Sequence, residues 1–274
     1  MTELTRRSIL TSLGTLGLGA AALNTAYQPA ANAAVAPDLN LDDPASNLEA
    51  YIRLRGDTSG EPVFDLARGQ VFGLIPGEAA RPLFKMIGAQ RSHYSRVSAL
   101  EYHIETRYVG MLLDWQTEQP LRNWVNPYTE KRCDVPVTNY GPTSARLLTD
   151  SMAALGAAPG KPPAATRPWY MLGDVVHMVD QIISPAVSAL QPDADLMTFS
   201  GDSRLLAESG LSRIPSRLSF TAVELWREWM QMPQQGSLWW HVAGVKLASA
   251  NDYPDEFRTE LLRVDPTFFS GVST

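Results

Sequence analysis

The chain contains few of the residues that build disulfides or metal sites. Its 274 residues include one cysteine, Cys133, and four histidines. A single cysteine excludes an internal disulfide. The histidines lie far apart in the sequence, without the close spacing of a metal-binding motif. They are His93, His103, His177 and His241. We expect no metal site, although three isolated histidines on neighbouring strands would be an alternative.

Catalytic fingerprints are also missing. The sequence contains no GxSxG elbow, no GxGxxG loop after a strand, no Walker phosphate loop and no HExxH helix. These absences argue against the common serine hydrolases, dinucleotide enzymes, nucleotide hydrolases and zinc proteases. We expect no cofactor, because the sequence contains no recognisable cofactor-binding motif.

Positive charge is scarce. The formal net charge is −6, from 23 basic and 29 acidic residues. Such a balance argues against nucleic acid or an anionic membrane surface as the partner. No apolar run after the N-terminal region is long enough to span a membrane. A homodimer remains compatible with this composition.

The first 33 residues predict an export signal. Arg6 and Arg7 precede an apolar run over 10–23 that is diluted by glycine and alanine, and a small-residue cleavage site follows at 31–33. Paired arginines before such a run are typical of twin-arginine signals. We therefore expect a periplasmic or extracellular protein whose single β-rich domain occupies residues 34–274.

Beyond about residue 48, apolar and polar residues alternate in many segments. Glycine and proline punctuate these segments at intervals of roughly a dozen residues, as in an antiparallel meander. One amphipathic helix, with Phe257, Leu261 and Val264 on one face, closes the chain. The pattern predicts an all-β fold: a strongly bent antiparallel sheet or lipocalin-like barrel that encloses a small ligand. An α+β fold is the alternative.

Residues 139–168 interrupt this pattern. The segment is rich in alanine, glycine and proline, and it predicts one short helix over 143–155 that ends at Gly156. We interpret it as an insertion or lid over the sheet, with a domain linker as the alternative.

Four stretches carry a resemblance. They are LEAYIRLRGDTSGEPVFDLARGQVFGLIPGE (48–78), WVNPYTEKRCDVP (124–136), DLMTFSGD (195–202) and GSLWWHVAGVKLA (236–248). Together they resemble the exported bacterial and fungal proteins grouped as domain of unknown function 1838. The resemblance implies one β-rich domain and export. It implies no agreed activity and no catalytic residues.

The first candidate site is the stretch from Tyr51 to Arg55. If the stretch is a strand, Tyr51, Arg53 and Arg55 share one face. Two arginines on one face could hold a carboxylate or a phenolate. A solvated face, or pairing with nearby acids, is the alternative.

A second group is His103, Glu105 and Arg107, which share one face of a predicted strand. Histidine beside glutamate can act as an acid–base pair, and the arginine could stabilise an anion. Alternatively, the arginine neutralises the glutamate, and these charged side chains pair across strands without a catalytic role. The opposite face carries Tyr102 and Tyr108, which could bind a substrate or serve as structural tyrosines.

Asp180, in HMVDQII, is the third candidate. A carboxylate among Val179 and Ile182 would be neutral or paired, which suits a general base. A carboxylate at a strand end is the alternative.

The fourth candidate is WREWMQMPQQGSLWWH, which holds four of the seven tryptophans. If SLWWHV is a strand, Trp239 and His241 share one face, and Trp240 lies on the other. The stretch is either core packing or the aromatic wall of a pocket with His241 at its rim.

These candidates favour a cofactor-independent enzyme acting by acid–base chemistry: elimination, retro-aldol-type cleavage or isomerisation. Histidine, tyrosine, carboxylates and arginine can move protons and stabilise oxyanions. The predicted substrate is a small apolar or aromatic molecule. We assign catalysis to His103, His241, Arg53, Arg107 and Asp180, and substrate binding to Tyr51, Tyr102, Tyr108, Trp239 and Trp240. A lipocalin-like carrier without turnover is the alternative. A metal-dependent hydrolase or oxygenase is the third hypothesis.

Overall fold

The computed structural model describes residues 39–148, 167–183 and 194–270. The predicted signal peptide (1–33) and most of the predicted insertion (139–168) lie outside these residues. No helix within the described ranges has both the length and the apolar character needed to cross a bilayer.

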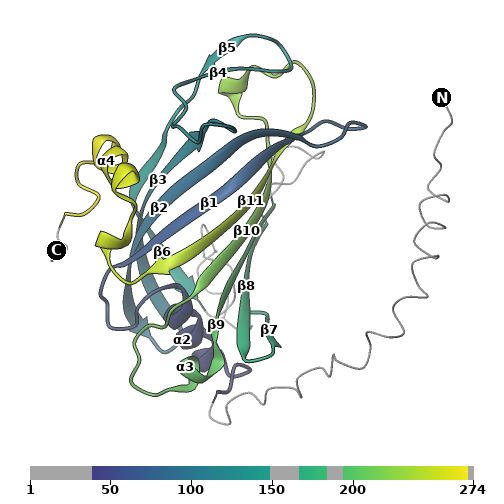
Figure 1. The fold of residues 1–274 in the computed structure, drawn as a ribbon. Coiled ribbons are helices and arrows are strands. Elements are labelled where there is room, and N and C mark those ends of the chain that lie inside the picture. Colours follow the sequence, from purple (N-terminus) through teal and green to yellow (C-terminus); the bar gives the residue numbers. More distant parts are fainter. Residues whose placement is uncertain (1–38, 149–166, 184–193, 271–274) are drawn as a thin grey trace, which may run out of the picture. The chain divides into compact units, whose positions relative to one another are not determined.

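Nine strands of the described chain form one antiparallel sheet (Figure 1). Its spatial order is β6-β3-β2-β1-β11-β10-β9-β8-β7. The strands are β1 (Val63–Leu74), β2 (Arg81–Ser98), β3 (Glu101–Leu113), β6 (Thr138–Leu148), β7 (Trp169–Leu172), β8 (Val175–Ile183), β9 (Ala194–Asp202), β10 (Arg217–Leu225) and β11 (Ser237–Leu247). The predicted all-β fold is therefore confirmed.

The sheet is strongly bent. Tyr102 on β3 and Phe199 on β9 belong to one buried cluster around helix α2 (Pro44–Arg55). Five strand spacings separate β3 from β9, so a flat sheet would hold them about 24 Å apart. The predicted bend is confirmed, and no pairing between β6 and β7 closes the described sheet into a barrel. We call the side that holds α2 the concave face.

Helix α2 corrects the predicted strand over Tyr51–Arg55. Asp43 caps its N-terminus by accepting a 2.9 Å hydrogen bond from Ser46 N, and Pro44 fills the first helical position. The alternation of Ile52 and Leu54 was misleading because the sheet surrounds this helix and buries nearly every side, which removes the usual apolar stripe.

Strand β6 corrects the predicted helix over 143–155, at least up to its last described residue. Thr143 pairs with Thr106, and the pairing with β3 continues to residue 148. Alanine and leucine favour a helix locally, but pairing with the edge of β3 overrides this preference.

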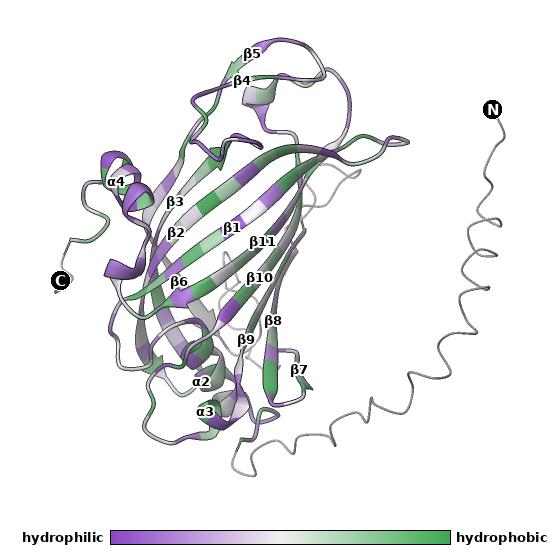
Figure 2. Cartoon of the chain, in the orientation of Figure 1, coloured by the Kyte–Doolittle hydropathy of each residue, from purple (hydrophilic) through white to green (hydrophobic). Residues whose placement is uncertain are grey.

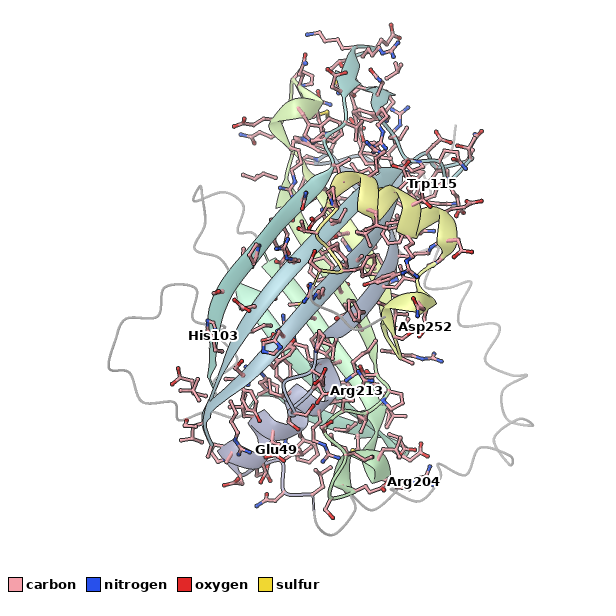
Figure 3. The ribbon with its side chains drawn as sticks, turned by 90° about the vertical axis from the view of Figure 1, so that its left-hand side faces the viewer. Glu49, His103, Trp115, Arg204, Arg213 and Asp252 are labelled. Atoms are coloured by element: carbon pink, nitrogen blue, oxygen red, sulfur yellow. The ribbon has the colours of Figure 1, made fainter. Side chains whose placement is uncertain are left out.

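The outer face carries the predicted C-terminal helix, α4 (Asp255–Val264). Phe257 and Leu261 of this helix pack on Val109 and Met111 of β3. In Figure 3 the helix lies across this face. The predicted helix is confirmed.

One end of the concave face is covered by a small hairpin of β4 (Asn123–Val125) and β5 (Arg132–Asp134), and by the short helix η2 (Glu228–Met230). Trp124 and Trp229 pack against Phe84 of β2, with ring centroids 4.9 and 5.9 Å away. Cys133 is buried beneath η2, with its Sγ 3.7 Å from Met230 O. The hairpin and η2 together are here called the cap. Figure 2 shows hydrophobic residues along the strands beside it.

Candidate functional site

The concave face carries a polar row that crosses five strands. From β11 to β6 its members are Lys246, Asp65, Gln90, Tyr108 and Tyr140, and each of them is paired with the next one on the adjacent strand. Neighbouring members are about 5 Å apart at their backbones. Such a row places an amine, a carboxyl, an amide and two phenols along one line.

A row of small residues runs directly beside the polar row. It consists of Gly244, Ala67, Gly88, Gly110 and Thr138. The ring of Tyr108 fills part of the space these residues leave, because Cβ atoms added at Gly88 and Gly110 would lie 2.7 and 2.6 Å from its Oη. Tyr108 also stacks on Tyr140, with ring centroids 5.1 Å apart. The two glycines therefore set the position of the Tyr108 ring.

An aromatic cavity of about 190 Å³ lies next to these rows. Its walls include Tyr108 of β3, Trp240 of β11 and Trp229 of the cap. Apolar side chains complete most of the lining, namely Met86, Leu112 and Leu238, and the polar contributions come from Thr138 and Arg227. A largely apolar wall with few polar groups is typical of a small-molecule site.

Of the predicted aromatic residues, Trp240 lies on the concave face and Trp239 on the outer one. The burial of their neighbours explains this: Leu238 and Val242 share the face of Trp240 and belong to the concave core. Trp239 instead contacts Phe72 on the outer face, at 5.4 Å between ring centroids.

Deeper in the concave face, helix α2 delivers a buried polar cluster. Tyr51 donates a 2.5 Å hydrogen bond to Asp180 Oδ2, and Arg55 donates to the Tyr51 phenol at 2.7 Å. Arg55 also forms an ion pair with Asp180 at 3.3 Å. Asp180 Oδ1 and Arg55 Nε are buried and have no hydrogen-bond partner in the structure. The predicted Tyr51 and Asp180 thus lie together, joined by Arg55.

Asp65 and Lys246 have displaced pKa values. Burial raises the pKa of Asp65 to about 7, against the opposing effect of Lys246 and Arg55. Burial lowers the pKa of Lys246 to about 7, against the attraction of Asp65. The ammonium group donates to Arg53 O at 2.8 Å and to Gly56 O at 2.9 Å. A carboxyl that titrates near neutrality can exchange protons at physiological pH.

All four histidines lie on the outer face. Their positions follow from strand alternation, since the neighbours of each belong to the concave side. His241 is exposed, and His177 stacks on Tyr170 at 4.8 Å between ring centroids. Figure 3 labels His103 on the face that carries α4. The structure therefore does not bring the predicted His103 and His241 to the aromatic cavity.

The predicted Arg107 also faces outward. It forms an ion pair with Asp265 at 3.2 Å and donates to Thr267, which fixes the segment after α4. Arg107, Glu105, Arg91 and His93 line a separate hollow of about 240 Å³ on this face. The predicted common face of His103, Glu105 and Arg107 is present, but it is not the concave one.

Arg53 points from α2 toward helix α3 (Ser203–Ala207). Its guanidinium donates to the carbonyls of Leu206 at 2.5 Å, Leu205 at 3.0 Å and Glu208 at 2.8 Å. These bonds satisfy carbonyls at the helix end. Tyr102, the remaining predicted binding residue, is buried in the core around α2.

The described residues contain no group of three or more histidine, cysteine, aspartate or glutamate side chains placed to hold a metal ion. A comparison of the chain with curated proteins gave no match. A family model described as a protein of unknown function, DUF1838, matches residues 60–147. Over this segment the chain is similar to that family.

The DUF1838 segment runs from just before β1 to the end of β6 and contains four of the five members of the polar row: Asp65, Gln90, Tyr108 and Tyr140. The row is therefore mostly a property of the matched segment. Helix α2 and strand β11 lie outside it, and they supply Arg55, Trp240 and Lys246.

Sequence reasoning overlooked Asp65 and Lys246. A usable signal was present for Asp65: it shares a strand face with Val63, which is apolar, so a charged residue there points inward. No comparable signal marked Lys246, because its strand reads as apolar on both faces.

Proposed function

We propose that the protein is an enzyme that binds a small aromatic molecule on the concave face and acts on it by acid–base chemistry. The observation that carries the proposal is the position of Asp65. This carboxyl, with its pKa near 7, is two strands from Tyr108, which walls the aromatic cavity. Binding surface and titrating group thus share one face.

Asp65 is the proposed base. It would remove a proton from a carbon atom of the bound molecule, and the electron pair left behind would move onto a neighbouring oxygen. The proton then returns to another atom, which gives isomerisation, or the electron pair expels a leaving group, which gives elimination. Both outcomes belong to the lyase and isomerase classes expected from the sequence.

Arg55 is the proposed stabiliser of the resulting anion. Its charge acts on Asp65, where the effect of Lys246 is larger, and also on Tyr140, so its field covers the middle of the concave face. Its Nε has no partner, while Tyr51 and Asp180 hold the other end of the guanidinium. A fixed, buried donor of this kind stabilises charge without reorganising.

The test is proton exchange. Aromatic ketones such as acetophenone carry a C–H bond that a base can break, and exchange in D₂O is read by NMR. We expect catalysed exchange that rises through about pH 7 and falls at least about 100-fold in Asp65→Asn. Glu105 is an exposed carboxylate on the outer face, so Glu105→Gln is the matched control. This variant should catalyse proton exchange at the wild-type rate. Equal rates in wild type and Asp65→Asn would refute Asp65 as the base.

A carrier without turnover is the second candidate, and one observation favours it. The lining of the aromatic cavity contains no carboxylate and no histidine. If ligands bind tightly to the wild type and to Asp65→Asn, and neither protein catalyses proton exchange or forms product, the protein is a carrier.

We also propose that residues 1–33 direct twin-arginine export. Changing Arg6 and Arg7 together to lysine should leave precursor in the cytoplasm. Mass analysis of the exported protein should show a mature N-terminus near residue 34, and an uncleaved precursor in the medium or periplasm would contradict the proposal.

A further inference from the structure

Asp65 of β1 and Gln90 of β2 are direct neighbours in the polar row. The Tyr253 phenol fixes this pair from the outer side of the sheet. It donates to the backbone carbonyls of both residues, at 3.0 Å to Asp65 O and 3.2 Å to Gln90 O. Tyr253 itself is buried in the cluster that packs α4 on the sheet. The two side chains therefore leave fixed backbones about 5 Å apart and point to the concave face.

The Asp65 carboxylate is open to a ligand. Its side chain is part-exposed, and within the described ranges neither oxygen accepts a hydrogen bond or is shielded from solvent. The neighbouring Lys246 does not occupy it, because this ammonium donates to Arg53 O at 2.8 Å and Gly56 O at 2.9 Å. A ligand can thus contact the carboxylate without displacing another side chain.

The Gln90 amide is oriented by polar neighbours. Its Nε2 donates to Ser92 Oγ at 3.0 Å, and Ser92 Oγ lies 3.4 Å from Thr106 Oγ1 of β3. These contacts engage the amide nitrogen. The amide oxygen, Oε1, accepts no hydrogen bond in the described part of the chain and is not shielded from solvent. Because an amide oxygen only accepts, Gln90 selects a ligand group that can donate a proton.

The spacing of this pair suits two bonds of one ligand atom. An O–H···O hydrogen bond spans about 2.8 Å, so acceptors about 5 Å apart can face a hydroxyl and a C–H bond on the same carbon. A carboxylate on the ligand fits poorly, because it would lose water and face two acceptors, Asp65 and Gln90 Oε1. The pair therefore favours an uncharged carbinol group.

We infer that Gln90 orients the substrate for Asp65, and that the substrate is an α-hydroxy ketone or α-hydroxy aldehyde. Its carbinol carbon carries both the hydroxyl that donates to Gln90 Oε1 and the proton that Asp65 removes. The inference rests on the proposed function, in which Asp65 is the base, and it names the substrate class.

The chemical step is an enolisation. The electron pair of the broken C–H bond moves onto the neighbouring carbonyl oxygen, the proton passes to Asp65, and the substrate becomes an enediolate. Return of a proton to the same carbon gives exchange with solvent. Return to the other carbon, with a proton passing between the two oxygens, moves the carbonyl group and isomerises the compound.

The first experiment compares proton exchange in D₂O for 2-hydroxyacetophenone and propiophenone, in which a methyl group replaces the hydroxyl. Each catalysed rate, as kcat/KM, is divided by the rate of the same compound in buffer, which corrects for C–H acidity. We expect the wild type to favour the hydroxy compound at least about tenfold. The preference should disappear in Gln90→Met and persist in Gln70→Met, the matched control on the outer face of β1.

A wild type without this preference would overturn the inference, and so would a preference that survives in Gln90→Met. A second measurement uses the wild-type protein and does not depend on the folding of a variant. The side-chain amide ¹⁵N–¹H signals of Gln90 should shift with 2-hydroxyacetophenone much more than with propiophenone, because a hydrogen bond to Oε1 polarises the amide. Equal shifts would overturn Gln90 as the acceptor.

Calorimetry on Asp65→Asn separates the inference from the proposed function. If 2-hydroxyacetophenone binds more tightly than propiophenone, and the added change Gln90→Met removes the difference, the ligand class is supported even where the wild type shows no Asp65-dependent exchange. That result would remove catalysis alone. Asp65-dependent exchange without a preference for the hydroxyl would overturn the ligand class and leave acid–base catalysis standing. Absence of both binding and exchange would overturn both.

Discussion

Tyr51 and Asp180 lie 129 positions apart in the chain, and the Tyr51 phenol donates a 2.5 Å hydrogen bond to the Asp180 carboxylate. The bond joins α2 to β8, near the far edge of the sheet. Arg55 contacts both residues and closes the group. The helix is thereby fixed inside the bend by polar contacts as well as by apolar packing.

Asp180→Asn should be the more damaging of two changes in this group. It leaves the Arg55 guanidinium buried without its counter-charge, which costs about 3–5 kcal/mol. Tyr51→Phe removes one hydrogen bond and should cost about 1–3 kcal/mol. Urea unfolding measures both, and a double-mutant cycle should show coupling. Tyr170→Phe, exposed on β7, is the control. Strictly additive losses would contradict the coupled group.

Asp65 should make stability fall as the pH rises from about 4 to about 7. Its pKa is raised to about 7 in the folded protein, while an unfolded carboxyl titrates near about 4. In this window the native state holds the proton more tightly, so the free energy of unfolding decreases with increasing pH. Asp65→Asn should remove this slope in urea titrations taken at each pH.

Lys246 should act in the opposite direction at higher pH. Its pKa is lowered to about 7, so the native state releases a proton that the unfolded chain keeps up to about pH 10. Stability from this group is therefore lost as the pH falls from about 10 to about 7. Lys246→Met should flatten that limb and, by removing the charge that opposes the raised pKa of Asp65, should extend the acidic limb to higher pH. A variant that alters only the window below pH 7 would disprove the assignment.

Arg53→Met should destabilise the protein by roughly 3 kcal/mol, because three carbonyls around α3 lose a charged donor. Ligand affinity per folded molecule should be unchanged, since Arg53 does not line the aromatic cavity. Thermal unfolding and calorimetry separate the two effects. Weaker ligand binding by fully folded Arg53→Met would show that Arg53 contributes to the ligand site.

Gly88→Ala should disturb the cavity through Tyr108. The new Cβ would lie 2.7 Å from the Tyr108 Oη, so the ring has to move. We expect a loss of about 1–3 kcal/mol in stability and weaker binding of aromatic probes. Adding Tyr108→Phe removes the shortest of these contacts and should restore part of both losses. An unchanged affinity in Gly88→Ala would show that the position of the Tyr108 ring does not affect ligand binding.

Alternation along long strands was a reliable guide to the fold. Trp240 and His241 were assigned to opposite faces of one strand from their spacing alone, and β11 confirms it. Alternation failed for Tyr51–Arg55, where two apolar residues were too few to separate a strand from a helix that is buried on most sides.

The choice between faces could not be read from a single strand. His103 and Tyr102 are equally good candidates in sequence, and only the packing of α2 and α4 on opposite sides decides that Tyr102 faces inward. The polar row was beyond sequence reasoning for a similar reason. Lys246 and Asp65 become neighbours through the pairing of β11 with β1, and neither segment encodes that pairing by itself.

The cap carries a natural chemical reporter. Cys133 is the only cysteine in the sequence, and its side chain is 1% exposed beneath η2. A thiol reagent can reach it only when the hairpin separates from Phe84 and from η2, so the labelling rate reports openings of one end of the aromatic cavity. A ligand that slows this labelling would report its own occupancy without any engineered probe.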